Sequence, residues 1–153
     1  MNVGNITPNL RQQAILRLTQ GDCSCVIVNG DRLHVFHSRG VRDLYHLLND
    51  EPTLLHGAFV ADKVIGKGAA ALMVVGGVVA VFAQVASKSA LELLQTSGIP
   101  VEVVHIVPHI INRAKTGLCP VEARCAGCRT AEECLPQIEA FLHGQTDESE
   151  ISK

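Results

Sequence analysis

The sequence lacks tryptophan and has only one tyrosine and four phenylalanines, so aromatic residues make up 3% of its 153 positions. Aromatic side chains are the stacking platforms of proteins that bind single-stranded nucleic acid, and their scarcity argues against that function. The sequence also has no large excess of positive or negative charge, because it contains 13 Lys and Arg and 15 Asp and Glu. A net charge of −2 argues against a dominant electrostatic footprint for nucleic acid. We therefore expect no nucleic-acid partner.

The compositional marks of disorder and of export are absent as well. Hydrophobic residues make up 47% of the chain and charged residues 18%, which a wholly disordered chain does not show. The opening residues, MNVGNITPNLRQQ, lack a cationic stretch followed by an apolar run, so they do not form a secretory signal. We expect one cytoplasmic domain over residues 1–145, followed by a polar tail over 146–153. In that compartment the six cysteines stay reduced.

The longest uncharged segment lies between Lys67 and Lys88 and reads GAAALMVVGGVVAVFAQVAS. Its twenty residues are long enough to span a bilayer. The pair Gly76-Gly77 interrupts the run, β-branched valines follow a stretch rich in alanine, and the far end is polar. The segment therefore predicts a helix, a turn and a strand inside a globular domain, and no membrane partner.

Helical and strand patterns alternate along the chain. Apolar positions at helical spacing predict helices over 7–20, 41–50, 66–75, 87–98 and 130–144. Short apolar or alternating runs predict strands over 23–30, 32–38, 56–62, 78–85 and 100–107, with a hairpin turn at 29–31. Helices separate the later strands, so these strands should be parallel and covered on both faces, with the hairpin as an antiparallel edge. The predicted fold class is α/β, a three-layer α/β/α domain with about five strands in a mixed sheet.

Two stretches carry a family resemblance. The run GAFVADKVIGKGAAALMVVGGVVAVFAQVASKSALELLQTSGIPVE, followed by VPHIINRAKTGLCPVE, resembles an uncharacterised bacterial and archaeal family of unknown function in the cytidine deaminase-like superfamily. The resemblance covers roughly residues 10–145 and is most specific at ADKVIGK, at SGI and at INR…TG.CP.E. It implies a cytidine deaminase-like α/β/α fold and no established activity.

The resemblance also allows a test for deaminase chemistry. Zinc deaminases place His-x-Glu or Cys-x-Glu at the start of one helix and Pro-Cys-x-x-Cys at the start of the next, where the ligands activate a water and the glutamate shuttles its proton. In the register that the resemblance implies, the first helix opens near Asp62, the glutamate position falls on Val64, and the cysteine positions fall near Ser87 and Ala90. Asp62, Ser87 and Ala90 cannot supply three zinc ligands. We therefore expect the usual zinc site to be missing.

Lysines stand near the same two helix starts. Lys63, Lys67 and Lys88 should meet at the carboxyl edge of the sheet, where open parallel sheets bind ligands. Helix N-termini and lysines favour anions, Gly66 permits close backbone approach, and an arginine suits bidentate anion binding. The predicted ligand site is Asp62, Lys63, Gly66, Lys67, Ser87, Lys88, Asn112 and Arg113. The alternative is that the lysines are solvated and Asp62 caps a helix.

Four of the six cysteines, Cys119, Cys125, Cys128 and Cys134, form a C-x5-C-x2-C-x5-C pattern. The C-x2-C pair puts two thiolates on one turn, and the flanking cysteines would complete a tetrahedral set for zinc or for an iron–sulfur cluster. A redox-active pair and merely structural thiols are the alternatives over this 119–134 loop. Cys23 and Cys25 lie two apart on the first strand, and we expect them on one face as core residues.

The leading functional prediction is a domain that binds a small anionic or nucleotide-like molecule. One alternative is an enzyme of changed chemistry, with Cys119 as nucleophile, Lys63 lowering the pKa of its thiol, and Glu122 or His109 as base. The other alternative is a cysteine-rich metal or redox module. The apolar content, which is generous for a short chain, is compatible with a homodimer.

Overall fold

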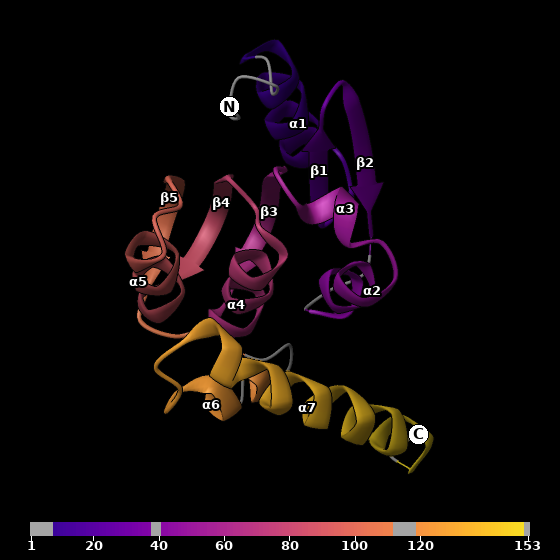
Figure 1. Ribbon diagram of the computed structural model, residues 1–153, viewed down its shortest axis with the longest axis vertical. Coiled ribbons are helices and arrows are strands. Elements are labelled where there is room, and N and C mark those ends of the chain that lie inside the picture. The colour runs from indigo at the N-terminus through magenta and orange to yellow at the C-terminus, as the bar shows by residue number, and fades with distance from the viewer. Residues whose placement is uncertain (1–7, 38–40, 112–118, 152–153) are drawn as a thin grey trace.

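A five-stranded mixed sheet lies at the centre of the fold (Figure 1). The structure, a computed structural model, describes residues 8–37, 41–111 and 119–151, and side chains over 9–37, 41–111 and 119–143. The strands are β1 (Cys25–Asn29), β2 (Arg32–Phe36), β3 (Phe59–Ile65), β4 (Ala80–Ser87) and β5 (Val101–Val107), in the spatial order β2-β1-β3-β4-β5. β1 is antiparallel to both neighbours, whereas β3, β4 and β5 run parallel. The predicted α/β class, with an antiparallel hairpin beside parallel strands, is confirmed.

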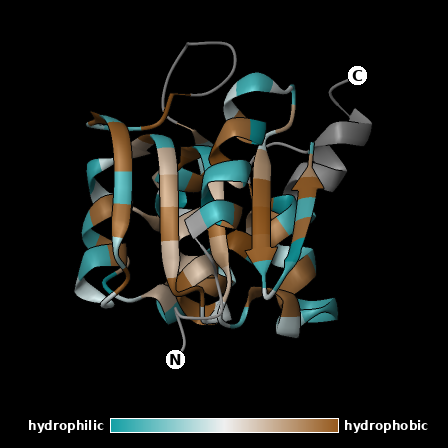
Figure 2. Cartoon of the chain, turned by 90° about the horizontal axis from the view of Figure 1, so that it is seen from above, coloured by the Kyte–Doolittle hydropathy of each residue, from teal (hydrophilic) through white to brown (hydrophobic). Residues whose placement is uncertain are grey.

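Helices cover both faces of this sheet. They are α1 (Pro8–Gln20), α2 (Arg42–Asp50), α3 (Pro52–Leu55), α4 (Lys67–Gly76), α5 (Lys88–Thr96), α6 (Pro120–Cys125) and α7 (Ala131–Ile151). α1 packs on one face through Ala14 and Leu18, and the larger core on the other face joins the sheet to α2, α4, α5 and α7. Figure 2 shows hydrophobic colour along β1, which is buried on both faces, and alternating colour along the edge strand β2. α6 and α7 lie at the end toward which the parallel strands run (Figure 1).

The uncharged run of the sequence forms the predicted helix, turn and strand. α4 ends at Gly76, and Gly77 adopts a left-handed conformation with φ 85° that a side chain would strain. The chain then enters β4, the central parallel strand. Within the described part of the chain, no helix is long and apolar enough to cross a bilayer.

The elements differ from the sequence-based prediction most clearly at β3, α3, α6 and α7. β3 begins at Phe59 instead of residue 56 and continues to Ile65, because residues 59–65 find backbone partners on β1 and β4. The short helices α3 and α6 were not predicted, since four and six residues hold too little of a helical repeat to detect. α7 continues to Ile151, so most of the predicted polar tail belongs to a helix.

Gly68 allows α4 to lie close to α6. A Cβ at this position would overlap Cγ1 of Val121, and it would lie 3.4 Å from Cγ1 of Val41. We expect Gly68→Ala to lower the free energy of unfolding by about 1–3 kcal/mol, because overpacking outweighs the roughly 1 kcal/mol that alanine gains in a helix. Denaturant unfolding measures the change. Gly127→Ala is the control: a Cβ there meets no atom within 4 Å, and a loss as large as that of Gly68→Ala would refute the close-packing explanation.

Candidate functional site

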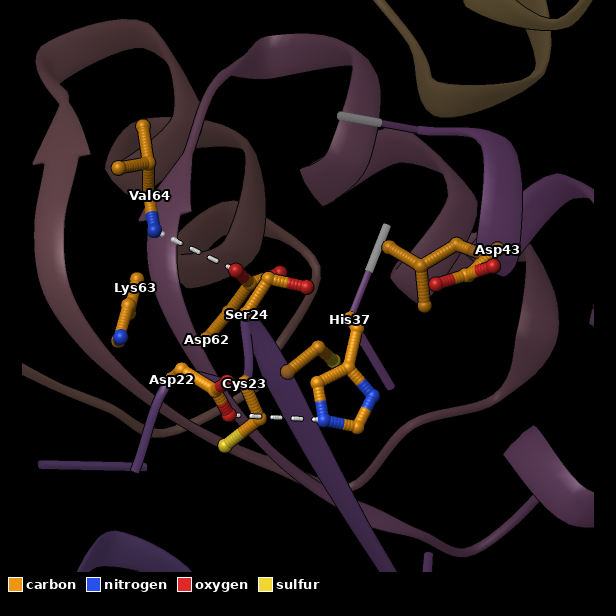
Figure 3. A pocket seen from close by; sticks show the side chains of 10 residues that line it. Asp22, Cys23, Ser24, His37, Asp43, Asp62, Lys63 and Val64 are labelled. Carbon is orange, nitrogen blue, oxygen red and sulfur yellow. Dashed lines mark hydrogen bonds and ion pairs between the residues drawn. The ribbon is translucent and has the colours of Figure 1, made fainter. Parts of the chain in front are cut away.

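A cavity of about 220 Å³ opens beside β3 on the face that carries the larger core. The start of β1, the residue after β2, the first turn of α2 and the second half of β3 line it (Figure 3). Its lining residues are Asp22, Cys23, Ser24, Cys25, His37, Asp43, Leu44, Asp62, Lys63 and Val64. Asp62 and Lys63 of the predicted ligand site therefore belong to one cavity.

Asp62 is the buried carboxyl of this cavity, with only 8% of the residue exposed. Its Oδ1 accepts a hydrogen bond from the backbone N–H of Val64 at 3.3 Å (Figure 3). Burial raises the pKa of Asp62 from 3.8 to about 7, because desolvation disfavours the charged form, and the nearby Asp43 charge raises it further. The Asp62 side chain can therefore bind a hydrogen-bond donor, or take up and release a proton, close to neutral pH.

Cys25 lies directly across from Asp62 on the neighbouring strand. Burial raises the pKa of the Cys25 thiol, and the charges of Asp62 and Asp43 raise it further. A thiol held protonated is a poor nucleophile. Cys23 and Cys25 are 1% and 6% exposed, so the prediction that they are core residues is confirmed. The prediction that they share one face is wrong, because Cys23 packs in the smaller core with α1 and Cys25 in the larger one, and β1 begins only at Cys25. Both also line the cavity.

Charged groups at the cavity mouth are more often acidic than basic. The exposed side chains of His37 and Asp22 face each other there, with Nε2 and Oδ1 3.7 Å apart (Figure 3). Lys63 donates from Nζ to the backbone oxygen of Gly21 at 3.2 Å. The lining thus holds three carboxyl groups, from Asp22, Asp43 and Asp62, beside one lysine and one histidine.

The structure separates the three lysines that the sequence placed together. Lys63 lies at the cavity, whereas Lys67 is buried and donates from Nζ to the backbone oxygens of Ala126 and Cys128. Lys88 is exposed at the first position of α5. Lys67 turns toward α6 and α7 because those helices pack against α4. The prediction that the first helix opens near Asp62 is wrong, since β3 continues to Ile65 and α4 begins at Lys67.

The other predicted ligand residues have contacts of their own. The Ser87 hydroxyl accepts from the backbone N–H of Ala90 at 3.2 Å and caps α5. Gly66 precedes α4, and a Cβ there would lie 3.0 Å from Oε1 of Glu122, so its close neighbour is a side chain of the same protein. Asn112 and Arg113 lie outside the described residues.

The side chain of Glu122, on α6, links that helix to the start of α4 through a hydrogen bond. Its Oε1 accepts from the backbone N–H of Lys67 at 2.7 Å, and its Oε2 accepts from the backbone N–H of Ile110 at 3.0 Å. Glu122 is 4% exposed. Gly66 offers no side-chain cap, so Glu122 supplies the negative group that a helix N-terminus favours. This contact occupies the helix start where the sequence predicted an anionic ligand.

The cysteines of the 119–134 loop do not gather as a set of four. Among the residues with described side chains, no three His, Cys, Asp or Glu are placed so that they could hold a metal ion. Cys119 precedes α6, donates its backbone N–H to Ile110 and does not line the cavity. Cys125 and Cys134 are completely buried, and the Cys128 thiol donates to the backbone oxygen of Glu133 at 3.5 Å. A zinc or iron–sulfur site at Cys119, Cys125, Cys128 and Cys134 therefore stays a prediction without structural support.

Several residues that line the cavity were not predicted from the sequence. Asp43 lies in the first turn of α2, where an acidic residue is common, so nothing marked it as a site residue. Asp22, Ser24 and His37 line the cavity through pairing of β1 with its neighbours. The usable signal is the charged pair Asp62-Lys63 among the apolar residues of FVADKVI, because charged side chains are rarely fully buried unless they are paired.

Comparison with known proteins identifies relatives by fold and by family. Residues 13–142 match the family described as TM1506, domain of unknown function (DUF1893). A crystal structure of a DUF1893 family protein (TM1506) from Thermotoga maritima superposes with a TM-score of 0.79 at 23% sequence identity, covering 88% of this chain and 91% of that chain. No relative was found among curated proteins. Because the family match spans most of its length, this chain belongs to the DUF1893 family of domains of unknown function.

Proposed function

We propose that this chain is a cytidine deaminase-like domain without the deaminase zinc centre, and that it binds a small polar, nucleoside-like ligand in the cavity beside Asp62. The resemblance of the sequence supports the deaminase-like part. The residues at the two helix starts, Gly66, Lys67, Ser87 and Lys88, include no thiol, imidazole or carboxylate. Such residues do not fit the His/Cys/Cys zinc set of a nucleobase deaminase.

The single observation that carries the binding proposal is the Asp62 carboxyl, buried at the wall of a 220 Å³ cavity. The backbone N–H of Val64 already donates to Oδ1, and a ligand that brings a donor would add a partner from the cavity side and offset more of the cost of burying this group. The cavity is smaller than most drug-sized sites, so it suits a nucleobase or a short amine. Its three carboxyl groups favour a ligand that presents an amino group over one that is purely anionic.

Thermal unfolding with cytidine, adenosine or inorganic phosphate tests this proposal. A nucleoside at 100 times its dissociation constant should stabilise the folded protein by about 2.7 kcal/mol. We expect Asp62→Asn to abolish the nucleoside shift, and Asp50→Asn, an exposed residue at the end of α2, to leave it unchanged. Stabilisation by phosphate alone, retained in Asp62→Asn, would instead support the anion site predicted from the sequence. No shift with any nucleoside would refute the proposal.

An enzyme is the second candidate, and the near-neutral pKa of Asp62 favours it. A group with a pKa of about 7 is well suited to general acid–base catalysis at physiological pH. Cys119 and Lys63, the catalytic pair predicted from the sequence, are less well supported, because Cys119 does not line the cavity that Lys63 lines. Turnover of a nucleoside that Asp62→Asn removes and Cys119→Ser retains would establish an enzyme that acts through Asp62.

A further inference from the structure

β5 forms one outer edge of the sheet. Within the residues that the structure describes, it is the last strand of the order β2-β1-β3-β4-β5, and β4 is the strand beside it (Figure 1). The backbone N–H of Val81, on β4, donates to the carbonyl oxygen of Pro100. Successive peptide groups point to opposite sides of a strand, so the even-numbered residues bond to β4. The N–H and C=O groups of the odd-numbered residues of β5 therefore point to the outer edge: Val101, Val103, His105 and Val107.

The sequence of β5 does not protect this edge against association. Natural edge strands are kept apart by lysine, proline, bulges or short length. β5 has seven residues, VEVVHIV, without lysine, arginine or proline, whereas the opposite edge strand β2 has five residues and begins with Arg32. Val104 and Ile106 are 58% and 51% exposed, and Val104 is the most exposed large apolar residue in the described part of the chain. β5 thus offers both a backbone edge and apolar side chains to a second strand.

We propose that two copies of this chain associate through β5, as an antiparallel pair of strands related by a two-fold axis at Val104. A backbone edge with strand spacing is complementary to another extended strand. Two-fold dimers are the commonest oligomers, and their interface is self-complementary. The pairing would join the two five-stranded sheets into one continuous sheet. No residue of β5 lines the Asp62 cavity, so the inference does not depend on ligand binding there.

The outward backbone groups select this register. With the axis at Val104, Val101 lies opposite Val107 of the partner subunit, and Val103 lies opposite His105 of the partner subunit. Residues paired in this way exchange two hydrogen bonds, so the outward groups of both strands form up to about eight. An axis at Val103 would leave Val107 without an opposite strand residue, and an axis at His105 would do the same to Val101.

The side chains fit the same register. Glu102, Val104 and Ile106 are all exposed and alternate along β5, so they lie on one face of the strand. Val104 meets its own copy at a position without hydrogen bonds, where the two Cα atoms approach to about 4.5 Å. Glu102 lies opposite Ile106 of the partner subunit, which keeps the two glutamates apart. The register therefore brings apolar side chains together on the axis and places no like charges directly opposite each other.

The size of this edge predicts a weak dimer. β5 is about 23 Å long, and the strand together with the α5 layer packed beside it is about 20 Å thick. The contact would cover roughly 450 Å² of each partner, whereas a standard stable interface covers about 800 Å² of each. Interfaces of the smaller size belong to weak and transient complexes. The proposed dimer should therefore form and dissociate as the protein concentration changes.

Sedimentation velocity of the full chain at a series of concentrations tests the proposal. We expect the average mass to rise reversibly from 16.4 kDa toward twice that value as the concentration passes through the micromolar range. A chain that stays monomeric up to about 1 mM would overturn the proposal.

Val104→Lys and Ile106→Lys form a matched pair, because both replace an exposed apolar residue of β5 by lysine. Val104→Lys places two ammonium groups opposite each other on the axis and should raise the dissociation constant at least about tenfold. Ile106→Lys places its ammonium group opposite Glu102 of the partner subunit, and this ion pair should hold the change below about threefold. Equal effects of the two variants, with folding verified by circular dichroism, would show that the axis does not lie at Val104.

Val104→Cys reports on the register directly. Two cysteines at facing positions without hydrogen bonds lie within the Cα separation of about 4.4–6.8 Å that a disulfide needs. We expect mild oxidation to link the introduced thiols into a covalent dimer. Leu16→Cys, at a 48% exposed position of α1, should stay monomeric, and the wild type controls for the partly exposed Cys119 and Cys128. The proposal fails if Val104→Cys is linked no faster than Leu16→Cys.

Discussion

Replacing Glu122 with alanine should lower the free energy of unfolding by about 3–5 kcal/mol, because two hydrogen bonds to a buried carboxylate are lost together. These bonds hold the backbone N–H groups of Lys67 at 2.7 Å and of Ile110 at 3.0 Å. With the carboxylate gone, both donors lose their partner in a site that is 4% exposed. Chemical denaturation followed by circular dichroism measures the loss.

Two variants separate this explanation from a general effect of removing a glutamate. Glu122→Gln keeps one oxygen acceptor, so it should cost roughly half as much as alanine. Glu92→Ala removes an exposed glutamate of α5 and should change stability by less than about 0.5 kcal/mol. If Glu122→Ala were no more harmful than Glu92→Ala, Glu122 would not be the group that caps α4.

Asp62 should make the protein less stable as the pH rises from about 4 to about 7. The pKa of Asp62 is raised from 3.8 to about 7 in the folded protein, so the folded state binds the proton more tightly than the unfolded state. The resulting stabilisation is complete below the unfolded pKa and is lost as pH passes through the folded pKa. A shift of this size corresponds to a loss on the order of 4 kcal/mol.

Asp62→Asn isolates this contribution from that of every other carboxyl group. The variant stays neutral, so its stability relative to the wild type should increase between about pH 4 and pH 7 and level off above that range. Asp50→Asn, at an exposed position, should track the wild type across the same range. Unfolding free energies measured at several pH values give the comparison. A difference between wild type and Asp62→Asn that is independent of pH would show that the Asp62 pKa is not raised.

The effects expected at Asp62 and Glu122 have the same physical cause, which is that both carboxyl groups are buried. Asp62 is the buried charged residue of a largely apolar strand, and Glu122 accepts a hydrogen bond from the first turn of an apolar helix. Each side chain has a partner from a distant part of the chain or faces a cavity. Substitution at either position therefore replaces a buried carboxyl group, and this is why the expected effects exceed those of surface residues.

Local patterns in the sequence determined most of the elements of this protein. The hairpin at 29–31, the break at Gly76-Gly77 and the alternation of helices with strands were all predicted, because turn residues and hydrophobic periodicity act between near neighbours. Asp62 was also predicted as a site residue, although for a different reason, since the resemblance placed it at the start of a helix and the structure places it inside β3. The family resemblance was found from the same stretches of sequence.

Only the tertiary structure determined which groups each polar side chain contacts. Lys67 and Glu122 are 55 positions apart in the sequence and meet because α6 and α7 pack on α4. The same packing directs Lys67 away from the predicted anion site. Asp43 and Cys25 reach Asp62 through packing of α2 and pairing of β1 with β3. The sequence determined which residues are polar and which elements carry them. The packing of distant elements determined which of those residues meet, because contact energies depend on three-dimensional proximity that local periodicity does not encode.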